Sequence, residues 1–259
     1  MEAPLTGGFQ EEIMPNRLRS DDPRMTETTA AKQAAKWLAE AWTSGNALPP
    51  LPAEIAPTDI AAGEAIAAAL VEALALPVCG IRLAPGPDGL TLLSAPLLEP
   101  RMLRVGAPIA MASLRHARIS AGMLGVLAEP LENGMPVFSA LHPVIDIAAS
   151  RYGTPPADAS HQVADLGGLG FVLMGKRWIG ALPEESEARI GLTGTRPYPI
   201  RAPLAALMRQ AAAAASRWGG LPAGSVLVVA GLSTGSPPVA GQKWSAAIPP
   251  VGRISATLS

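Results

Sequence analysis

The order in which helices and strands are predicted limits the fold of this chain more than any other feature. Two amphipathic helices are predicted first, over 28–44 and 59–76, and Gly45 and Pro77 end them. A long stretch of short strands and turns follows, and one further helix, 203–218, precedes the last strands. Because strands and helices do not alternate regularly, the pattern is not that of a doubly wound parallel sheet. The order predicts an α+β fold in which helices flank a mixed, rolled β-sheet.

The predicted strands differ in pattern, which indicates how each is buried. The stretch 225–230 is apolar throughout, as in a central strand covered on both faces. The stretch 253–258 alternates apolar and polar residues, as in a strand with one solvent-facing side. The stretch 153–164 is expected to be an irregular loop. The remaining predicted strands are 78–83, 116–127, 144–148, 169–174 and 243–247.

Length and composition favour one domain with one large core. The chain has 259 residues, of which 49% are hydrophobic, and no Gly/Ser-rich or charged linker divides it. We expect a domain over 28–259, with a helical part (28–77) and a sheet-rich part (78–259). Residues 1–27 are polar and acidic and are expected to form a flexible N-terminal tail. They lack the basic start and apolar segment of a signal peptide, and no apolar run has the length of a membrane span.

Charge and cysteine content exclude several function classes. The net charge is −1 and there is no Lys/Arg block, which argues against nucleic-acid binding. Cys79 is the only cysteine, so no intrachain disulfide can form, and a reducing, cytoplasmic location is expected. Cys79 itself lies in an apolar strand, where we expect it to pack against its neighbours and not to act as a nucleophile. Only 16% of residues are charged, and this favours a surface partly covered in an oligomer.

Four stretches of the sequence, in this order, carry a resemblance to a known family. They are 78–83, the strand 116–127, the segment 142–152 and the C-terminal part from 203 onward. Together they resemble the fumarylacetoacetate hydrolase superfamily, in particular its 2-keto-4-pentenoate hydratase branch. The resemblance covers most of the chain from about residue 28 and implies the same mixed, rolled sheet.

The resemblance implies a metal-dependent reaction whose ligands are largely missing here. Family members add water to a 2-hydroxy-dienoate or its 2-keto tautomer, and a Mg²⁺ or Mn²⁺ ion stabilises the enolate. A Glu-x-Glu motif and a third acidic residue hold that ion, and a lysine lies nearby. Here Ser120 and Gly122 stand at the two Glu positions, Asp146 at the third, and Arg82 at the lysine. We therefore assign no metal ligand and no cofactor, and expect metal binding to be weak or absent unless both glutamates are restored.

The remaining polar residues suggest how a small anion would bind. The resemblance implies catalytic positions at Arg82, Ser120 and Asp146. His116 and Arg118 share the face of Ser120 by the period of a strand, and an arginine can hold a carboxylate in place of a metal. The alternative is that both arginines form ion pairs with Asp146 and fill the pocket. The turn that carries Ser233 and Thr234 either donates hydroxyls to the ligand or is an ordinary turn.

Two functions remain open from the sequence, and so does the question of whether the chain is an enzyme. The first is a hydratase-like hydro-lyase, acting on a small 2-oxo or 2-hydroxy-dienoate, with a degenerate metal site. The second is a non-catalytic homologue that binds a small carboxylate or serves as the structural partner of an active paralogue. By the same resemblance, a homo-oligomer is expected in either case.

Overall fold

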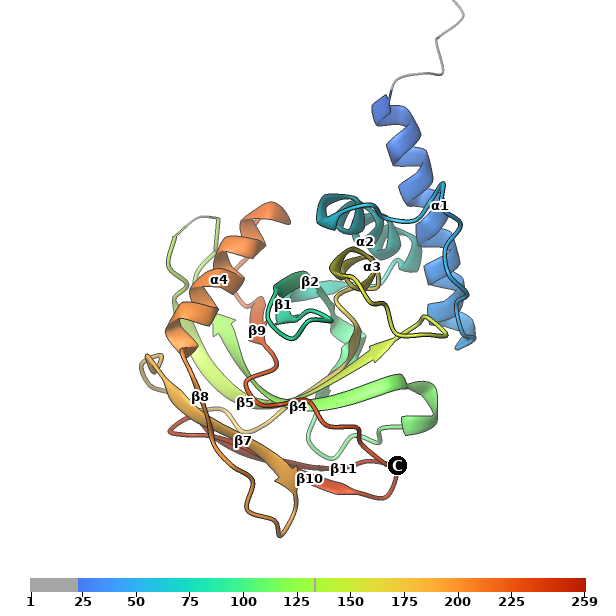
Figure 1. Cartoon of the computed structure of the whole chain (residues 1–259). Helices are drawn as coiled ribbons and strands as arrows, with labels where there is room; N and C mark the ends of the chain where they lie inside the picture. Colours follow the sequence, from blue (N-terminus) through green and yellow to red (C-terminus); the bar gives the residue numbers. More distant parts are fainter. Residues whose placement is uncertain (1–22, 133) are drawn as a thin grey trace, which may run out of the picture.

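A curled, seven-stranded mixed sheet forms the centre of the molecule in the computed structural model, which describes residues 23–132 and 134–259 (Figure 1). Its strand order is β2-β1-β9-β4-β5-β6-β3, and most neighbours are antiparallel. The strands are β1 (Val78–Pro85), β2 (Leu92–Leu98), β3 (Met102–Arg104), β4 (Arg115–Leu127), β5 (Phe138–Ser150), β6 (Leu169–Met174) and β9 (Val226–Val229).

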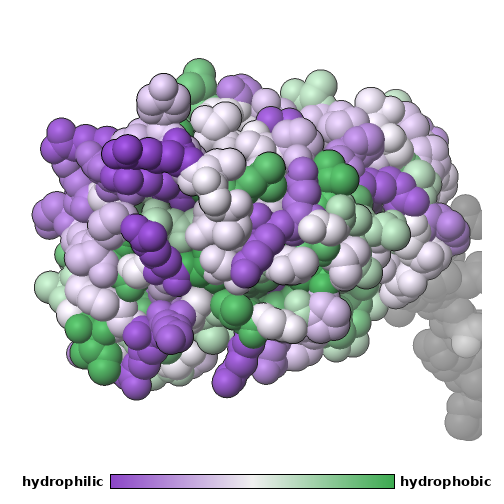
Figure 2. Space-filling view, turned by 90° about the horizontal axis from the view of Figure 1, so that it is seen from below, coloured by the Kyte–Doolittle hydropathy of each residue, from purple (hydrophilic) through white to green (hydrophobic). Residues whose placement is uncertain are grey.

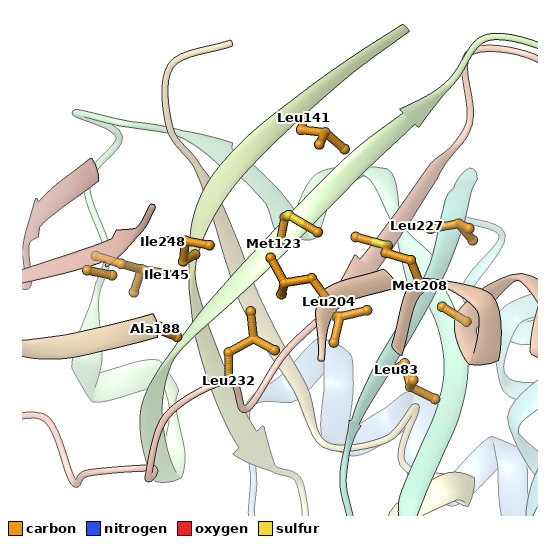
Figure 3. Packing of buried hydrophobic residues seen from close by; sticks show 14 of the residues in the cluster. Leu83, Met123, Leu141, Ile145, Ala188, Leu204, Met208, Leu227, Leu232 and Ile248 are labelled. Atoms are coloured by element: carbon orange, nitrogen blue, oxygen red, sulfur yellow. The ribbon is translucent and has the colours of Figure 1, made fainter. Parts of the chain in front are cut away.

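A smaller sheet and the helix α4 (Leu204–Arg217) cover one face of the large sheet. The small sheet has the order β11-β10-β7-β8. Its strands are β7 (Ser186–Leu192), β8 (Ile200–Ala202), β10 (Lys243–Ile248) and β11 (Gly252–Thr257). Figure 3 shows the resulting core, in which Met123 of β4 and Ile145 of β5 lie among side chains of both sheets and of α4.

The helices α1 (Pro23–Ser44), α2 (Ile60–Leu74) and α3 (Ala159–Ala164) pack against the opposite face. The period of a strand explains how one sheet supplies two cores. Met123 belongs to the core under the small sheet, whereas the next residue, Leu124, belongs to the core under the helices. Val144 and Ile145 divide in the same way. The central strands are therefore buried on both faces, in agreement with the apolar run of β9.

The predicted α+β class and the mixed, rolled sheet are confirmed, with differences at particular elements. The stretch predicted as an irregular loop contains α3, which begins after Asp158, whose carboxylate accepts a hydrogen bond from the His161 amide. A helix of six residues is too short to show a 3.6-residue period, so its sequence does not indicate a helix. The expected elements do not include β7 and β8. β8 has only three residues, whereas in β7 the buried Ala188 and Ile190 alternate with the outward Glu187 and Arg189, a pattern typical of a half-exposed strand.

The N-terminal helix is longer than expected. It begins at Pro23, whose fixed φ suits the first turn of a helix, and not at Thr28. The tail predicted over 1–27 therefore overlaps the start of α1. Residues 1–22 lie outside the described residues, and the flexibility expected of them remains a prediction.

Among the described residues no helix is both long and apolar enough to cross a membrane. On the face seen in Figure 2, polar and apolar side chains are mixed, and no single apolar patch covers the face.

Candidate functional site

A cavity of about 690 Å³ opens on the face of the large sheet that carries the helices, beside α3. This volume is in the range of small-ligand sites. Its walls come from the strands β1, β4 and β5, the loop 84–89, Pro155–Pro156 and the turn 231–235. All seven residues that the sequence predicts for the site line this one cavity: Arg82, His116, Arg118, Ser120, Asp146, Ser233 and Thr234.

The cavity lies on this face because its polar residues alternate with core residues along the strands. Arg82, Ser120 and Asp146 point toward the helices, whereas the preceding residues Ile81, Ile119 and Ile145 belong to the opposite core. Ser120 and Asp146 are direct partners in the register of β4 and β5.

Arg82 and Asp146 form a buried, bidentate ion pair in the wall of the cavity. The Arg82 Nε and Nη2 atoms each donate to one oxygen of Asp146, both at 2.7 Å. The third nitrogen, Nη1, donates to the Gly167 carbonyl oxygen at 2.9 Å. Arg82 is only 2% exposed and Asp146 only 1% exposed. Each of the three guanidinium nitrogens therefore donates to the protein, and the ion pair adds no net charge to the cavity.

Arg118, in contrast, is exposed in the cavity and carries an uncompensated charge. Its Nη2 atom donates to the Gly235 carbonyl oxygen at 2.8 Å. No carboxylate of the described residues lies within ion-pair distance of it. Arg82 forms an ion pair with Asp146 and Arg118 does not, so the alternative in which both arginines pair with Asp146 is wrong. Arg118 consequently keeps free N–H donors for an anion in the cavity.

The turn beside Arg118 offers further donors. The Ser233 hydroxyl accepts a hydrogen bond from the Ala121 amide at 2.9 Å, which fixes the turn to β4. Its own hydrogen is then available to the cavity, as is the hydroxyl of the exposed Thr234. The backbone N–H groups of residues 233–235 donate to no acceptor among the described residues. A group of donors of this kind suits an anion.

His116 enters the cavity from a bulge in β4. The pairing of β4 with β5 is irregular between Arg115 and Arg118, and His116 has a φ of 51°. Its Nε2 atom lies 2.9 Å from the Gly153 carbonyl oxygen. A bulge typically redirects a side chain, and here it places an imidazole at the mouth of the cavity.

Comparison with known proteins identifies the fold. No family model and no curated protein sequence matches the chain. Among solved structures it is similar to 4-oxalocrotonate decarboxylase from Pseudomonas putida G7, complexed with magnesium and adipate, with a TM-score of 0.75 and 15% identity over 89% of this chain and 98% of that one. The 5-carboxymethyl-2-hydroxymuconate delta-isomerase from Mycobacterium smegmatis has a TM-score of 0.54 and 14% identity over 71% of this chain and 78% of that one.

The chain has the fumarylacetoacetate hydrolase fold. The resemblance predicted from the sequence is thus confirmed at the level of the fold. At sequence identities of 14–15% a shared fold does not establish a shared activity. What this chain can bind or catalyse depends on the residues in its cavity.

The residues at the expected metal position of this fold do not fit a divalent cation. Both oxygens of Asp146 already accept hydrogen bonds from Arg82, and the Ser120 hydroxyl accepts one from the Gly231 amide at 3.2 Å. Mg²⁺ requires several oxygen ligands in near-octahedral arrangement. Among the described residues, no group of three His, Cys, Asp or Glu side chains is placed to hold a metal.

Position 122 also lacks room for a ligand. A Cβ atom on Gly122 would lie 2.7 Å from the Val229 carbonyl oxygen and 2.8 Å from a methyl group of Val144. The backbone of β9 thus occupies the space that a glutamate would need. Restoring Glu at both 120 and 122 therefore also requires β9 to move, so we now expect the double substitution alone to leave metal binding weak.

Three lining residues, Asp88, Gln162 and Asp165, were not predicted as site residues. A hydrogen bond from the Thr91 hydroxyl, with two from backbone amides, lowers the pKa of the Asp88 carboxyl, so it stays charged at the rim. Asp165 is fully buried and pairs with Arg151 at 2.6 Å. Asp88 lies in a turn and Gln162 in a helix too short to predict, so neither gave a sequence signal.

Cys79 lies outside the cavity, and we expect it to react slowly. Burial and the nearby Glu99 carboxylate raise the pKa of the thiol to about 11. Because the thiolate is the reactive form, its reaction with a disulfide reagent at pH 8 should be roughly a hundredfold slower than that of a free cysteine. The measurement is the release of thionitrobenzoate by the native protein compared with the unfolded protein. Equal rates in the two states would contradict the burial of Cys79.

Proposed function

We propose that this chain binds a small 2-oxo or 2-hydroxy carboxylate in the cavity without a divalent cation. The observation that carries the proposal is Arg118, a cation without a carboxylate partner among the described residues, in a ligand-sized cavity. The charge of Arg118 requires an anion or water as its partner. A carboxylate is the natural choice, since its two oxygens match the fork of a guanidinium.

The surrounding groups support a ligand that has an oxygen next to its carboxylate. Arg118 is anchored to Gly235, so its guanidinium lies against the turn 233–235. The N–H groups of this turn have no acceptor within the described part of the chain. The hydroxyls of Ser120, Ser233 and Thr234 face the same cavity. A carboxylate on Arg118 would leave the 2-oxo or 2-hydroxy oxygen within the reach of these donors.

The names of the structural neighbours favour the dienoate class of ligand. They include a decarboxylase of 4-oxalocrotonate and an isomerase of 2-hydroxyhepta-2,4-diene-1,7-dioate. The solved decarboxylase also holds adipate, a saturated dicarboxylate. We extend this class of ligand to the present chain as part of the proposal, because the cavity and its cation are compatible with it.

A metal-dependent hydratase is not part of the proposal, because the residues at the metal position do not fit the ion. The chain is then a homologue that binds its ligand without the hydration reaction. A hydro-lyase remains the second candidate. The observation that favours it is the open cavity, which Arg82, Ser120 and Asp146 line together. A protein that served only as a structural partner would not need to keep such a cavity.

The proposal is tested with 2-hydroxypenta-2,4-dienoate as the probe. At about 100 times its dissociation constant, a ligand stabilises the native state by about 2.7 kcal/mol, which raises the unfolding temperature by several degrees. We expect this shift in the presence of EDTA, and no formation of the hydration product, 4-hydroxy-2-oxopentanoate, in proton NMR spectra when Mg²⁺ is added. Hydration of the diene would instead support the second candidate, and the absence of any thermal shift would contradict the proposal.

A further inference from the structure

His116 has an unusual backbone conformation at the mouth of the cavity. Its φ of 51° lies in the left-handed region, which is unfavourable for a residue with a side chain. His116 is exposed, so no core packing accounts for this conformation. Strained residues of this kind occur often at functional sites.

The protein fixes the tautomer of this imidazole. The Nε2 atom lies 2.9 Å from the Gly153 carbonyl oxygen, and a carbonyl oxygen can only accept a hydrogen bond. In the neutral ring the hydrogen therefore resides on Nε2, and Nδ1 carries the lone pair. No hydrogen-bond partner for Nδ1 exists among the described residues. His116 thus presents a free base held in place by its other nitrogen, which is the arrangement of a general base.

The neighbouring groups could stabilise the product of proton removal. Removing a proton from C3 of a 2-oxo acid places negative charge on the C2 oxygen. Arg118, two residues further along β4, offers free N–H donors, and the turn 233–235 offers hydroxyl and amide donors. Fixed donors directed at a developing oxyanion are an effective means of lowering a reaction barrier.

We infer that His116 catalyses the enolisation of a bound 2-oxo acid without a metal ion. The Nδ1 lone pair takes the proton from C3, and the electrons of the C3–H bond form the C2–C3 double bond. The C2–O π electrons move onto the oxygen, which becomes an enolate. Return of the proton from Nδ1 to C3 restores the ketone, whereas protonation of the oxygen gives the enol. The step consumes no oxidant, reductant or second substrate.

This inference rests on the proposed binding of a 2-oxo acid, and the experiment separates the two. The probe is 2-oxobutanoate in D₂O, and proton NMR follows the loss of its C3 protons, while calorimetry measures its binding. The wild-type protein should accelerate the exchange over buffer alone. The variant His116→Asn should lower the enzymatic exchange rate about a hundredfold, the usual size of a general-base contribution, and retain binding. Asparagine is chosen because it tolerates a positive φ.

The matched control is His161→Asn, which removes a histidine outside the cavity that pairs with Asp158. This variant should exchange at the wild-type rate. If 2-oxobutanoate binds but the wild type does not accelerate exchange, or if His116→Asn exchanges as fast as the wild type, the inference falls and the proposed binding stands. If 2-oxobutanoate does not bind at all, both are overturned.

Discussion

The variant Arg82→Ala is expected to lose about 3–5 kcal/mol of unfolding free energy, because the substitution leaves the carboxylate of Asp146 buried without a partner. In the native protein both oxygens of Asp146 accept hydrogen bonds from the Arg82 guanidinium, and the Gly167 carbonyl oxygen accepts one from its Nη1 atom. Water has little access to the pair, so it cannot replace the lost hydrogen bonds. Urea denaturation, followed by circular dichroism, measures the change.

Two further variants show whether the loss arises from the unpaired charge. Replacing both residues, Arg82→Met with Asp146→Leu, should destabilise less than Arg82→Ala, because it leaves no charge buried. Arg201 forms an ion pair with Glu185 at the surface, where it is 78% exposed. The control Arg201→Ala should therefore change stability by about 1 kcal/mol or less. A loss of similar size in Arg82→Ala and Arg201→Ala would show that the buried pair is not formed.

The variant Arg118→Ala is expected to weaken oxalate binding by about tenfold to a hundredfold. A hydrogen bond to a charged group contributes about 1.5–3 kcal/mol, and each 1.4 kcal/mol corresponds to a factor of ten. Arg118→Lys should retain part of the affinity, since it keeps the charge but loses the bidentate fork. Calorimetric titration of each variant with oxalate gives the dissociation constants.

The control for Arg118 is Arg177→Ala. Arg177 is also exposed and also donates to a backbone carbonyl, that of Ser139, but it does not line the cavity. Its replacement should leave oxalate binding unchanged. Equal affinity in Arg118→Ala and the wild type would mean that the anion, if it binds, contacts other residues.

The sequence predicted much of the fold because its main strands have strong patterns. The strand 169–174 was predicted with the bounds that β6 has, and the apolar run at 225–230 contains β9, which is central in the sheet. It missed β7, although Glu187 and Arg189 alternate there with the buried Ala188 and Ile190, and it missed α3, a helix of six residues that follows the cap of Asp158. A helix as short as α3 leaves little local signal in the sequence, because it spans fewer than two turns.

The sequence predicted which residues line the cavity more reliably than what each of them contacts. The period of a strand placed Arg118 and Ser120 on one face, and both line the cavity. The choice of the arginine that pairs with Asp146 depends on the strand order β1-β9-β4-β5. This order brings Arg82 of β1 within hydrogen-bond distance of Asp146 of β5, 64 positions away in the sequence. Likewise, the sequence shows that Gly122 has no carboxylate, but only the structure shows that the backbone of β9 fills the space.

The measurement that tests the central claim most directly is calorimetric titration of the wild-type protein with oxalate, first in EDTA and then with Mn²⁺. Oxalate imitates a 2-oxo acid and chelates a metal strongly, so it detects either kind of site. We predict the same affinity for free oxalate under both conditions, once the oxalate chelated by Mn²⁺ in solution is subtracted, because Arg118 and not a cation holds the ligand. Binding that requires Mn²⁺ would contradict the account and show that Asp146 can leave Arg82 to hold a metal.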